Sequence, residues 1–149
     1  MTQTIMQTTL IAMNALPDNP VSRPSILVVE DFRLLRTSVV QWLQYRFPGC
    51  VVHGVETGEQ ALEHVRNARP DVVLMDIDLP GIGGLEATAR IKAESPDTKI
   101  AMLTTYDTPQ HRSAATLAGA EGYVPKHDME RQLESTVEGL LRARAGRRP

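Results

Sequence analysis

Two short apolar runs that each end in an acidic residue restrict the fold of this chain more than any other feature. Residues 26–29 (ILVV) lead into Glu30 and Asp31, and residues 72–75 (VVLM) lead into Asp76. An unbroken apolar run of this length is typical of a strand buried on both faces of a parallel sheet. Shorter or weaker runs predict three further strands, at residues 50–55, 100–103 and 122–124.

Segments with helical patterns separate these strands. Thr57 and Gln60 form a capping box at the start of one helix, and Gly119 ends the helix expected over residues 109–118. A strand followed by a helix occurs five times, which predicts an α/β fold with a parallel sheet covered on both faces. A length of 149 residues fits one domain. We expect a flexible leader over residues 1–24, a folded domain over 25–141 and a basic tail over 142–149.

Composition and charge exclude several classes of protein. A net charge of −2 argues against binding nucleic acid through bulk positive charge, and the single cysteine, Cys50, excludes an internal disulfide framework. No apolar run is long enough to span a membrane. Residues 1–16 contain no Lys or Arg, which argues against a secretory signal, so we expect a cytoplasmic protein. An alternative for the leader is that it docks or pairs with a partner chain.

Five polar side chains follow the predicted strands. Because the strands are parallel, these side chains are expected to meet at one edge of the sheet, the edge where ligands bind in such folds. They are Glu30, Asp31, Asp76, Thr104 and Lys126. Clustered carboxylates repel each other, and a hard divalent cation such as Mg²⁺ neutralises them through oxygen ligands. Taken singly, each residue has a structural explanation as a helix cap, a structural hydroxyl or a surface charge. No glycine-rich phosphate loop is present, so a bound nucleotide is not expected.

The same segments carry a resemblance to a known family. Glu30-Asp31, VVLMDIDLPGIGG (72–84), IAMLTTYD (100–107) and GAEGYVPK (119–126) occur in the order typical of response-regulator receiver domains of two-component signalling. The resemblance covers residues 25–141 and implies a flavodoxin-like (βα)5 fold, a doubly wound sandwich with strand order 2-1-3-4-5. The pair Thr105-Tyr106 and the lack of proline after Lys126 are most similar to receivers of the nitrate-regulator type.

The resemblance implies a role for each site residue. Asp76 is the expected phosphoacceptor and uses Mg²⁺ or Mn²⁺. Asp31 is expected to bind the metal directly, Glu30 through water, and Asp78 through its backbone carbonyl. Thr104 is the expected switch hydroxyl, Lys126 the lysine that contacts phosphate, and Tyr123 the aromatic switch residue.

Partners follow from the same resemblance. The phosphoryl donor would be a sensor histidine kinase or a phosphotransfer protein. The output would be a downstream protein or a homodimer, bound through the face formed by the helix at 109–118, the strand at 122–124 and the last helix. We expect no output domain after the tail, so that the chain acts by binding a protein or by passing the phosphoryl group onward, unless it is part of a longer transcription factor.

Two departures from the family pattern and two alternative functions complete the expectations. His127 stands where the family usually has proline, and Asp78 places an acid two residues after the acceptor. One alternative is a degenerate receiver that binds partners without phosphorylation. The other is an aspartate-nucleophile phosphatase, suggested by Asp76-Ile77-Asp78 but disfavoured by the early position of Glu30 and Asp31. We otherwise expect no enzyme activity beyond the chain's own phosphorylation and dephosphorylation.

Overall fold

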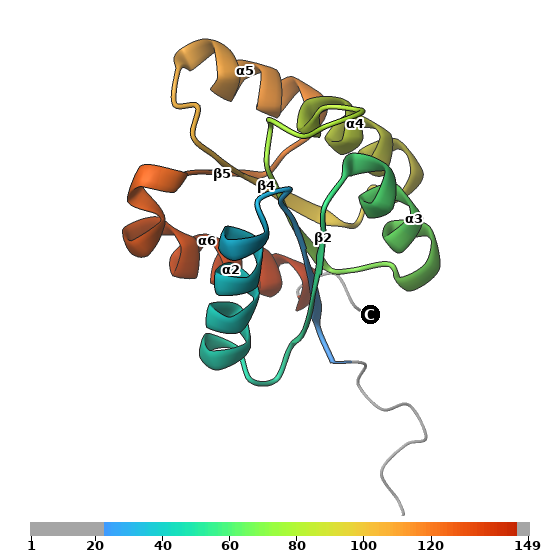
Figure 1. Ribbon diagram of the computed structural model, residues 1–149. Coiled ribbons are helices and arrows are strands. Elements are labelled where there is room, and N and C mark those ends of the chain that lie inside the picture. Colours follow the sequence, from blue (N-terminus) through green and yellow to red (C-terminus); the bar gives the residue numbers. More distant parts are fainter. Residues whose placement is uncertain (1–22, 146–149) are drawn as a thin grey trace, which may run out of the picture.

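The computed structural model describes residues 23–145, and within them a five-stranded parallel sheet in the order β2-β1-β3-β4-β5 (Figure 1). The expected flavodoxin-like architecture and strand order are therefore confirmed. The strands are β1 (Ser25–Val29), β2 (Val51–Val55), β3 (Val72–Met75), β4 (Lys99–Thr104) and β5 (Gly122–Pro125). The helices are α2 (Arg33–Arg46), α3 (Gly58–Ala68), α4 (Gly84–Glu94), α5 (Pro109–Ala118) and α6 (Met129–Ala145), with a short 3₁₀ turn, η1 (Lys126–Asp128), before α6.

The sheet separates two apolar cores. Successive side chains of a strand point to opposite faces, so Ile26 and Val28 of β1 enter one core while Leu27 and Val29 enter the other. Helices α2 and α6 cover the first core, and α3, α4 and α5 cover the second. β1, β3 and β4 are almost wholly buried, as their continuous apolar runs predict.

Local signals set most helix ends where the sequence predicts them. The capping box of Thr57 and Gln60 is present at the start of α3. Helix α5 begins with Pro109 and ends at Gly119, whose φ of 104° requires a residue without a Cβ. Phe32 lies at the N-cap position of α2, and 60% of its surface is exposed.

The C-terminal helix is longer than the sequence indicates. α6 continues to Ala145, so the first residues of the expected tail are helical. Arg144 pairs with Asp71 at the start of β3, and only 14% of its side chain is exposed. Arg144, although it belongs to the expected basic tail, is therefore packed against the folded domain. Residues 1–22 of the expected leader lie outside the described residues.

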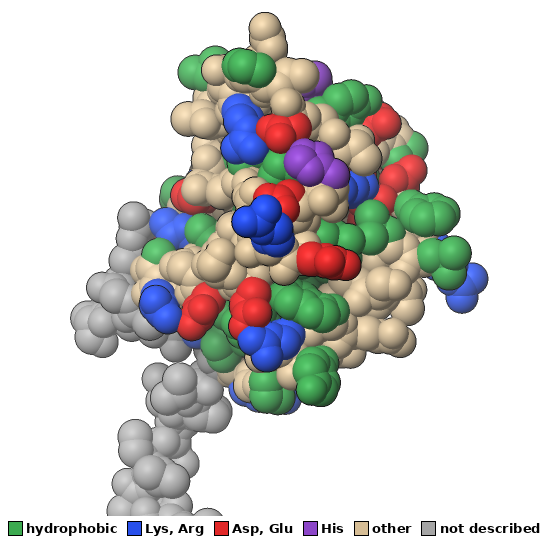
Figure 2. Space-filling view, turned by 90° about the vertical axis from the view of Figure 1, so that its left-hand side faces the viewer, with side chains coloured by type: hydrophobic (Ala, Val, Ile, Leu, Met, Phe, Trp, Pro, Cys, Tyr) green, Lys and Arg blue, Asp and Glu red, His purple; other side chains and the backbone are tan. Residues whose placement is uncertain are grey.

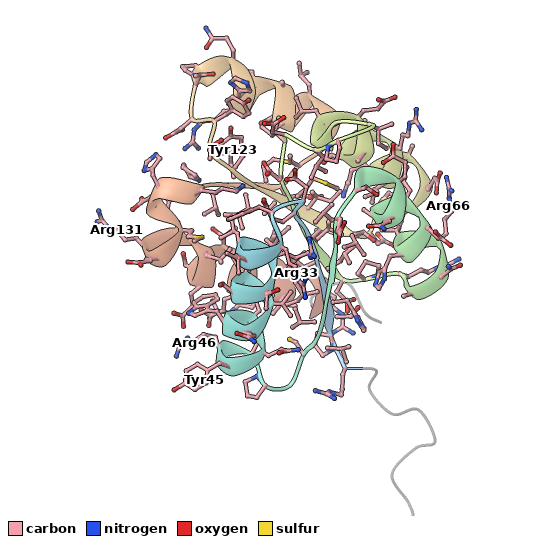
Figure 3. All side chains as sticks on the ribbon, in the orientation of Figure 1. Arg33, Tyr45, Arg46, Arg66, Tyr123 and Arg131 are labelled. Carbon is pink, nitrogen blue, oxygen red and sulfur yellow. The ribbon has the colours of Figure 1, made fainter. Side chains whose placement is uncertain are left out.

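The side of the molecule that displays α2 and α6 carries acidic and basic side chains close together, with apolar side chains between them (Figure 2). Tyr45 and Arg46 extend outward from the end of α2, and Arg131 extends outward from α6 (Figure 3). No helix among residues 23–145 has both the length and the apolar character needed to cross a lipid bilayer.

Candidate phosphoryl-acceptor site

Three carboxylates meet where β1 and β3 end. Val29 pairs with Met75 in the parallel register, so the residues that follow them, Glu30 and Asp76, are neighbours. Both are buried, at 3% and 4% exposure, whereas Asp31 is exposed. One oxygen from each of these three carboxylates lies within 4.8 Å of the others. The structure thus brings together the acidic residues that the sequence singled out.

Lys126 supplies the positive charge at this cluster. It follows β5, and its Nζ lies 2.8 Å from Glu30 Oε2 and 2.9 Å from Asp76 Oδ2. Burial raises the pKa of Glu30 and the nearby charge of Asp76 adds to this effect, while Lys126 opposes it. Burial also opposes the charge on Lys126, but its contacts with both carboxylates outweigh burial and raise its pKa. The ammonium group is therefore a built-in counterion for two buried acids.

The donor set of this cluster fits a hard divalent cation. Among residues 23–145, the metal-ligating atoms that converge there are carboxylate oxygens, and the exposed Asp31 leaves one side of the cluster open to solvent. Asp78 lies against the same group, since its backbone N–H donates a 3.2 Å hydrogen bond to Asp76 Oδ1. Its own side chain is exposed. Glu30, Asp31 and Asp76 are thus the residues that would hold a metal ion, beside the backbone of Asp78.

A glycine allows the start of α4 to pass close to the backbone of Asp76. A Cβ on Gly84 would overlap the backbone carbonyl oxygen of Asp76, and the Gly84 N–H donates a 2.9 Å hydrogen bond to Ile77 O. At Gly83 a Cβ would make only an ordinary 3.7 Å contact with Ile77 O. The second glycine of the pair is therefore the one that the local packing requires.

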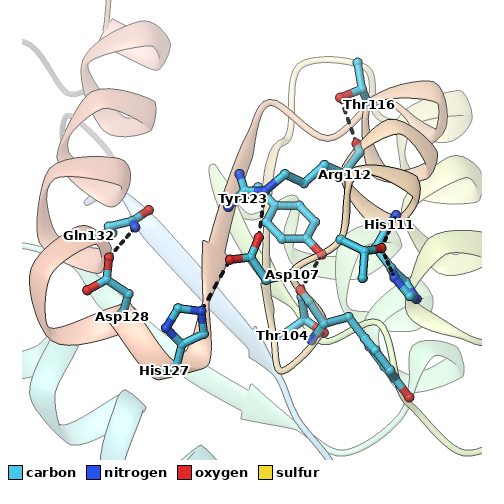
Figure 4. A network of polar contacts seen from close by, with 11 residues as sticks. Thr104, Asp107, His111, Arg112, Thr116, Tyr123, His127, Asp128 and Gln132 are labelled. Carbon is cyan, nitrogen blue, oxygen red and sulfur yellow. Dashed lines mark hydrogen bonds and ion pairs between the residues drawn. The ribbon is translucent and has the colours of Figure 1, made fainter.

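Thr104 and Tyr123 lie on the next two strands and are linked through one loop residue. Thr104 is fully buried, and its Oγ1 accepts a 3.3 Å hydrogen bond from the Tyr106 N–H. Tyr123 Oη donates a 2.6 Å hydrogen bond to the Tyr106 carbonyl (Figure 4). Burial raises the pKa of Tyr123, and the Arg112 guanidinium stacks over its ring, 4.6 Å from the centroid. The two expected switch residues therefore both form a hydrogen bond with the backbone of Tyr106, in the loop between β4 and α5.

An exposed polar network that the sequence did not indicate surrounds this loop. Asp107 accepts a 2.8 Å hydrogen bond from Arg112 and lies 3.3 Å from His127 Nε2 (Figure 4). Both contacts lower the pKa of Asp107, the one with Arg112 most. His127 thus joins η1 to the β4–α5 loop, which a proline at this position could not do. No spacing in the sequence predicts these pairs, because each one depends on the approach of separate elements.

A parallel five-stranded fold with carboxylates, a hydroxyl and a lysine at its strand ends agrees with one family by sequence as well. The family model for the response regulator receiver domain matches residues 26–138. The chain belongs to this family. Response regulator GacA of Pseudomonas aeruginosa is 37% identical over 123 residues, which are 83% of this chain and 56% of that protein. Oxygen regulatory protein NreC of Staphylococcus carnosus is 35% identical over 118 residues, 78% of this chain and 54% of that protein.

Solved structures agree with the receiver assignment. The response regulator TrrA of Thermotoga maritima, in complex with Mg²⁺-BeF, is 35% identical with a TM-score of 0.70, covering 78% of this chain and 98% of that one. The chemotaxis protein CheY4 of Vibrio cholerae has a TM-score of 0.73 at 28% identity, covering 80% and 99%. A receiver domain is a signalling module of two-component systems rather than a metabolic enzyme. This receiver chain spans about half the length of the curated relatives it matches.

Proposed function

We propose that this receiver accepts a phosphoryl group on Asp76, with Mg²⁺ or Mn²⁺ bound by Glu30, Asp31, Asp76 and the backbone carbonyl of Asp78. The observation that carries the proposal is the surroundings of Asp76. Its buried carboxylate lies within 4.8 Å of two further acids and has a lysine ammonium 2.9 Å away. Phosphoryl transfer depends mainly on such positioning and charge neutralisation.

The transfer itself is a displacement at phosphorus. An oxygen of Asp76 forms the new P–O bond while the bond from phosphorus to the donor atom breaks, and the electron pair leaves with the donor. With a phosphohistidine donor from a sensor kinase or phosphotransfer protein, the leaving atom is an imidazole nitrogen. The product is an acyl phosphate, which water hydrolyses back to the carboxylate. A bound Mg²⁺ supplies positive charge to the phosphoryl oxygens.

Lys126 then has a defined task. Its ammonium already contacts Asp76 Oδ2, so a short movement brings it to an oxygen of the incoming phosphoryl group. That contact is a charge-assisted hydrogen bond, which is stronger than a neutral one. Lys126 thereby stabilises the phosphorylated state, in addition to neutralising the charge of the two acids in the unphosphorylated state.

The switch acts through Thr104 and Tyr123. Phosphorylation adds about −1.5 to −2 charge and new acceptor oxygens at Asp76. Since Thr104 Oγ1 accepts its bond from Tyr106, its own proton remains available to donate to such an oxygen. A shift of Thr104 would be transmitted through Tyr106 to Tyr123 and Arg112. We therefore place the output on the α5–β5–α6 face, which binds a downstream protein or a second copy of this chain in the cytoplasm.

Intact-mass measurement tests the proposal. Wild type and Asp76→Asn are incubated with Mg²⁺ and acetyl phosphate, and the intact mass of each protein is measured after the reaction. The gain of one phosphoryl group in wild type alone is expected, and omitting Mg²⁺ should abolish it. A folded wild-type protein that gains no mass would contradict the proposal and favour the degenerate receiver. Steady release of phosphate from a generic phosphomonoester would instead support the phosphatase.

A further inference from the structure

The first turn of α3 holds the tip of the loop that follows the phosphoacceptor. Glu59 Oε1 accepts a 2.9 Å hydrogen bond from the backbone N–H of Ile82, which lies in the loop of residues 78–83. The two residues belong to different elements and are 23 positions apart in the chain. This contact joins a helix that has no expected role at the site to the loop that carries Asp78.

Glycines on both sides of this contact let the loop and the helix approach each other. Gly81 has a φ of 74°, and a Cβ at this position would overlap the carboxylate of Glu59. A Cβ on Gly58 would lie 2.7 Å from Cγ1 of Ile82 and 3.1 Å from the Ile82 carbonyl oxygen. The Glu59 carboxylate therefore occupies the space that a side chain at position 81 would need.

The charge of Glu59 suits this contact. The hydrogen bond from Ile82 is the main cause that lowers the pKa of Glu59, so the group is a carboxylate at neutral pH. An ionised acceptor forms a stronger hydrogen bond with a backbone N–H than a neutral one. The acidic residue also lies in the first turn of α3, where the helix dipole favours negative charge.

The loop is held at its other points by contacts around Asp76. The Asp78 N–H bonds Asp76 Oδ1, Gly84 N bonds Ile77 O, and the side chain of Leu79 is buried in the core. Glu59 adds an attachment on the solvent side, at the tip. With both sides held, the backbone at Asp78 has little freedom to turn away from the carboxylates.

We infer that Glu59 is a positioning residue, which holds the 78–83 loop in the arrangement that divalent-cation binding requires. This inference rests on the proposed function, because Asp78 is an expected metal ligand in that proposal. Glu59 acts through the Ile82 amide and not by contact with the ion. Its effect therefore depends on its acceptor oxygen, and the negative charge strengthens the hydrogen bond that this oxygen accepts.

Three variants of the full chain separate the effect of the acceptor oxygen of Glu59 from the effect of its charge. Glu59→Ala removes the acceptor, whereas Glu59→Gln keeps an acceptor oxygen and removes the charge. Glu63→Ala is the matched control, since it removes an exposed acid from the same helix one turn further on. Urea unfolding of each variant establishes that the fold is kept.

Two readouts are measured on every variant. Hydrogen exchange of residues 78–83, followed by mass spectrometry without metal, reports the loop alone. Mn²⁺ binding, followed by the loss of the free-ion EPR signal, reports the cation site. We expect Glu59→Ala to exchange about fivefold faster in this loop and to bind Mn²⁺ about threefold more weakly. Glu59→Gln keeps an acceptor oxygen but forms a weaker hydrogen bond, so it should fall between wild type and Glu59→Ala. Glu63→Ala should remain close to wild type.

The outcomes distinguish this inference from the proposed function. Wild-type exchange and Mn²⁺ affinity in Glu59→Ala would overturn the positioning role and leave the proposed function intact. Equal weakening in Glu59→Ala and Glu59→Gln would also overturn it, because charge alone would then explain the effect. A wild-type chain that binds no Mn²⁺ would contradict the proposed metal site, and with it the role of Glu59.

Discussion

Lys126 neutralises charge at the site, and this role can be measured without phosphorylation. Its ammonium is the positive charge in contact with two buried acids, Glu30 and Asp76. A buried charge that loses its partner destabilises a protein much more than a lost surface pair does. The metal-free receiver should therefore depend on this lysine for stability.

We predict that Lys126→Met lowers the free energy of unfolding by about 2 kcal/mol in the absence of divalent ions. Added Mg²⁺ should restore part of the loss, because the ion replaces the missing positive charge. Urea denaturation with and without Mg²⁺ measures both effects. Arg131→Met is the control, since 85% of the Arg131 side chain is exposed and its loss should change stability by less than about 0.5 kcal/mol.

The adjacent glycines at the start of α4 provide a second test at the residue scale. Gly84→Ala places a methyl group onto the Asp76 carbonyl, so the backbone of Asp76 must move. We expect a loss of about 3 kcal/mol or more in unfolding free energy, together with slower phosphorylation. Gly83→Ala should be within about 1 kcal/mol of wild type, because its added Cβ meets only an ordinary contact. Similar effects of the two substitutions would contradict the packing described here.

At the scale of elements, α3 depends on a cap that is local in sequence. Thr57 Oγ1 accepts a 3.1 Å hydrogen bond from the Gln60 N–H, and the Gln60 side chain accepts one in return from the Thr57 N–H. Thr57→Ala should lower the free energy of unfolding by about 1 kcal/mol, whereas Thr57→Ser should keep most of it. Circular dichroism during urea unfolding gives both values. A larger loss in Thr57→Ser than in Thr57→Ala would contradict the cap.

Elements and strand-end residues were predictable from sequence for a physical reason. Capping boxes and terminal glycines act within a few residues, and parallel strands bring their carboxyl ends to one edge whatever their neighbours are. Asp76 and Lys126 could therefore be placed together before the structure was known. The bond of Glu59 to Ile82 and the contacts of Asp107 could not, because they depend on how separate elements pack.

At the scale of the whole molecule, an ion pair links two distant parts of the chain at the end of the sheet opposite the site. Arg144 near the end of α6 meets Asp71 at the start of β3, with 14% and 19% of their side chains exposed. Asp71 also accepts a 2.9 Å hydrogen bond from the Ser25 N–H. This pair explains why the sequence pattern alone ended the last helix too early.

Arg144→Ala should consequently lower the unfolding free energy by about 1–2 kcal/mol, because it leaves the largely buried Asp71 without this cation. Arg142→Ala should change it by less than about 0.5 kcal/mol, since that side chain is 76% exposed and pairs one turn away with Glu138. Thermal and urea unfolding of the two variants give the comparison. Equal stability of both would show that the last turn of α6 contributes little.

The strand order has a consequence for the time course of folding during synthesis. Ile26 of β1 pairs with Val72 of β3, so the first strand waits for more than forty further residues before its central partner exists. At about 5–20 residues per second this interval lasts seconds, during which β1 can pair only with β2 and its other edge stays open. If β1 and β3 paired as soon as both had been synthesised, Glu30 and Asp76 would meet before Lys126 had been translated. We therefore expect the nascent chain to complete this pairing late, once its own counterion has left the ribosome.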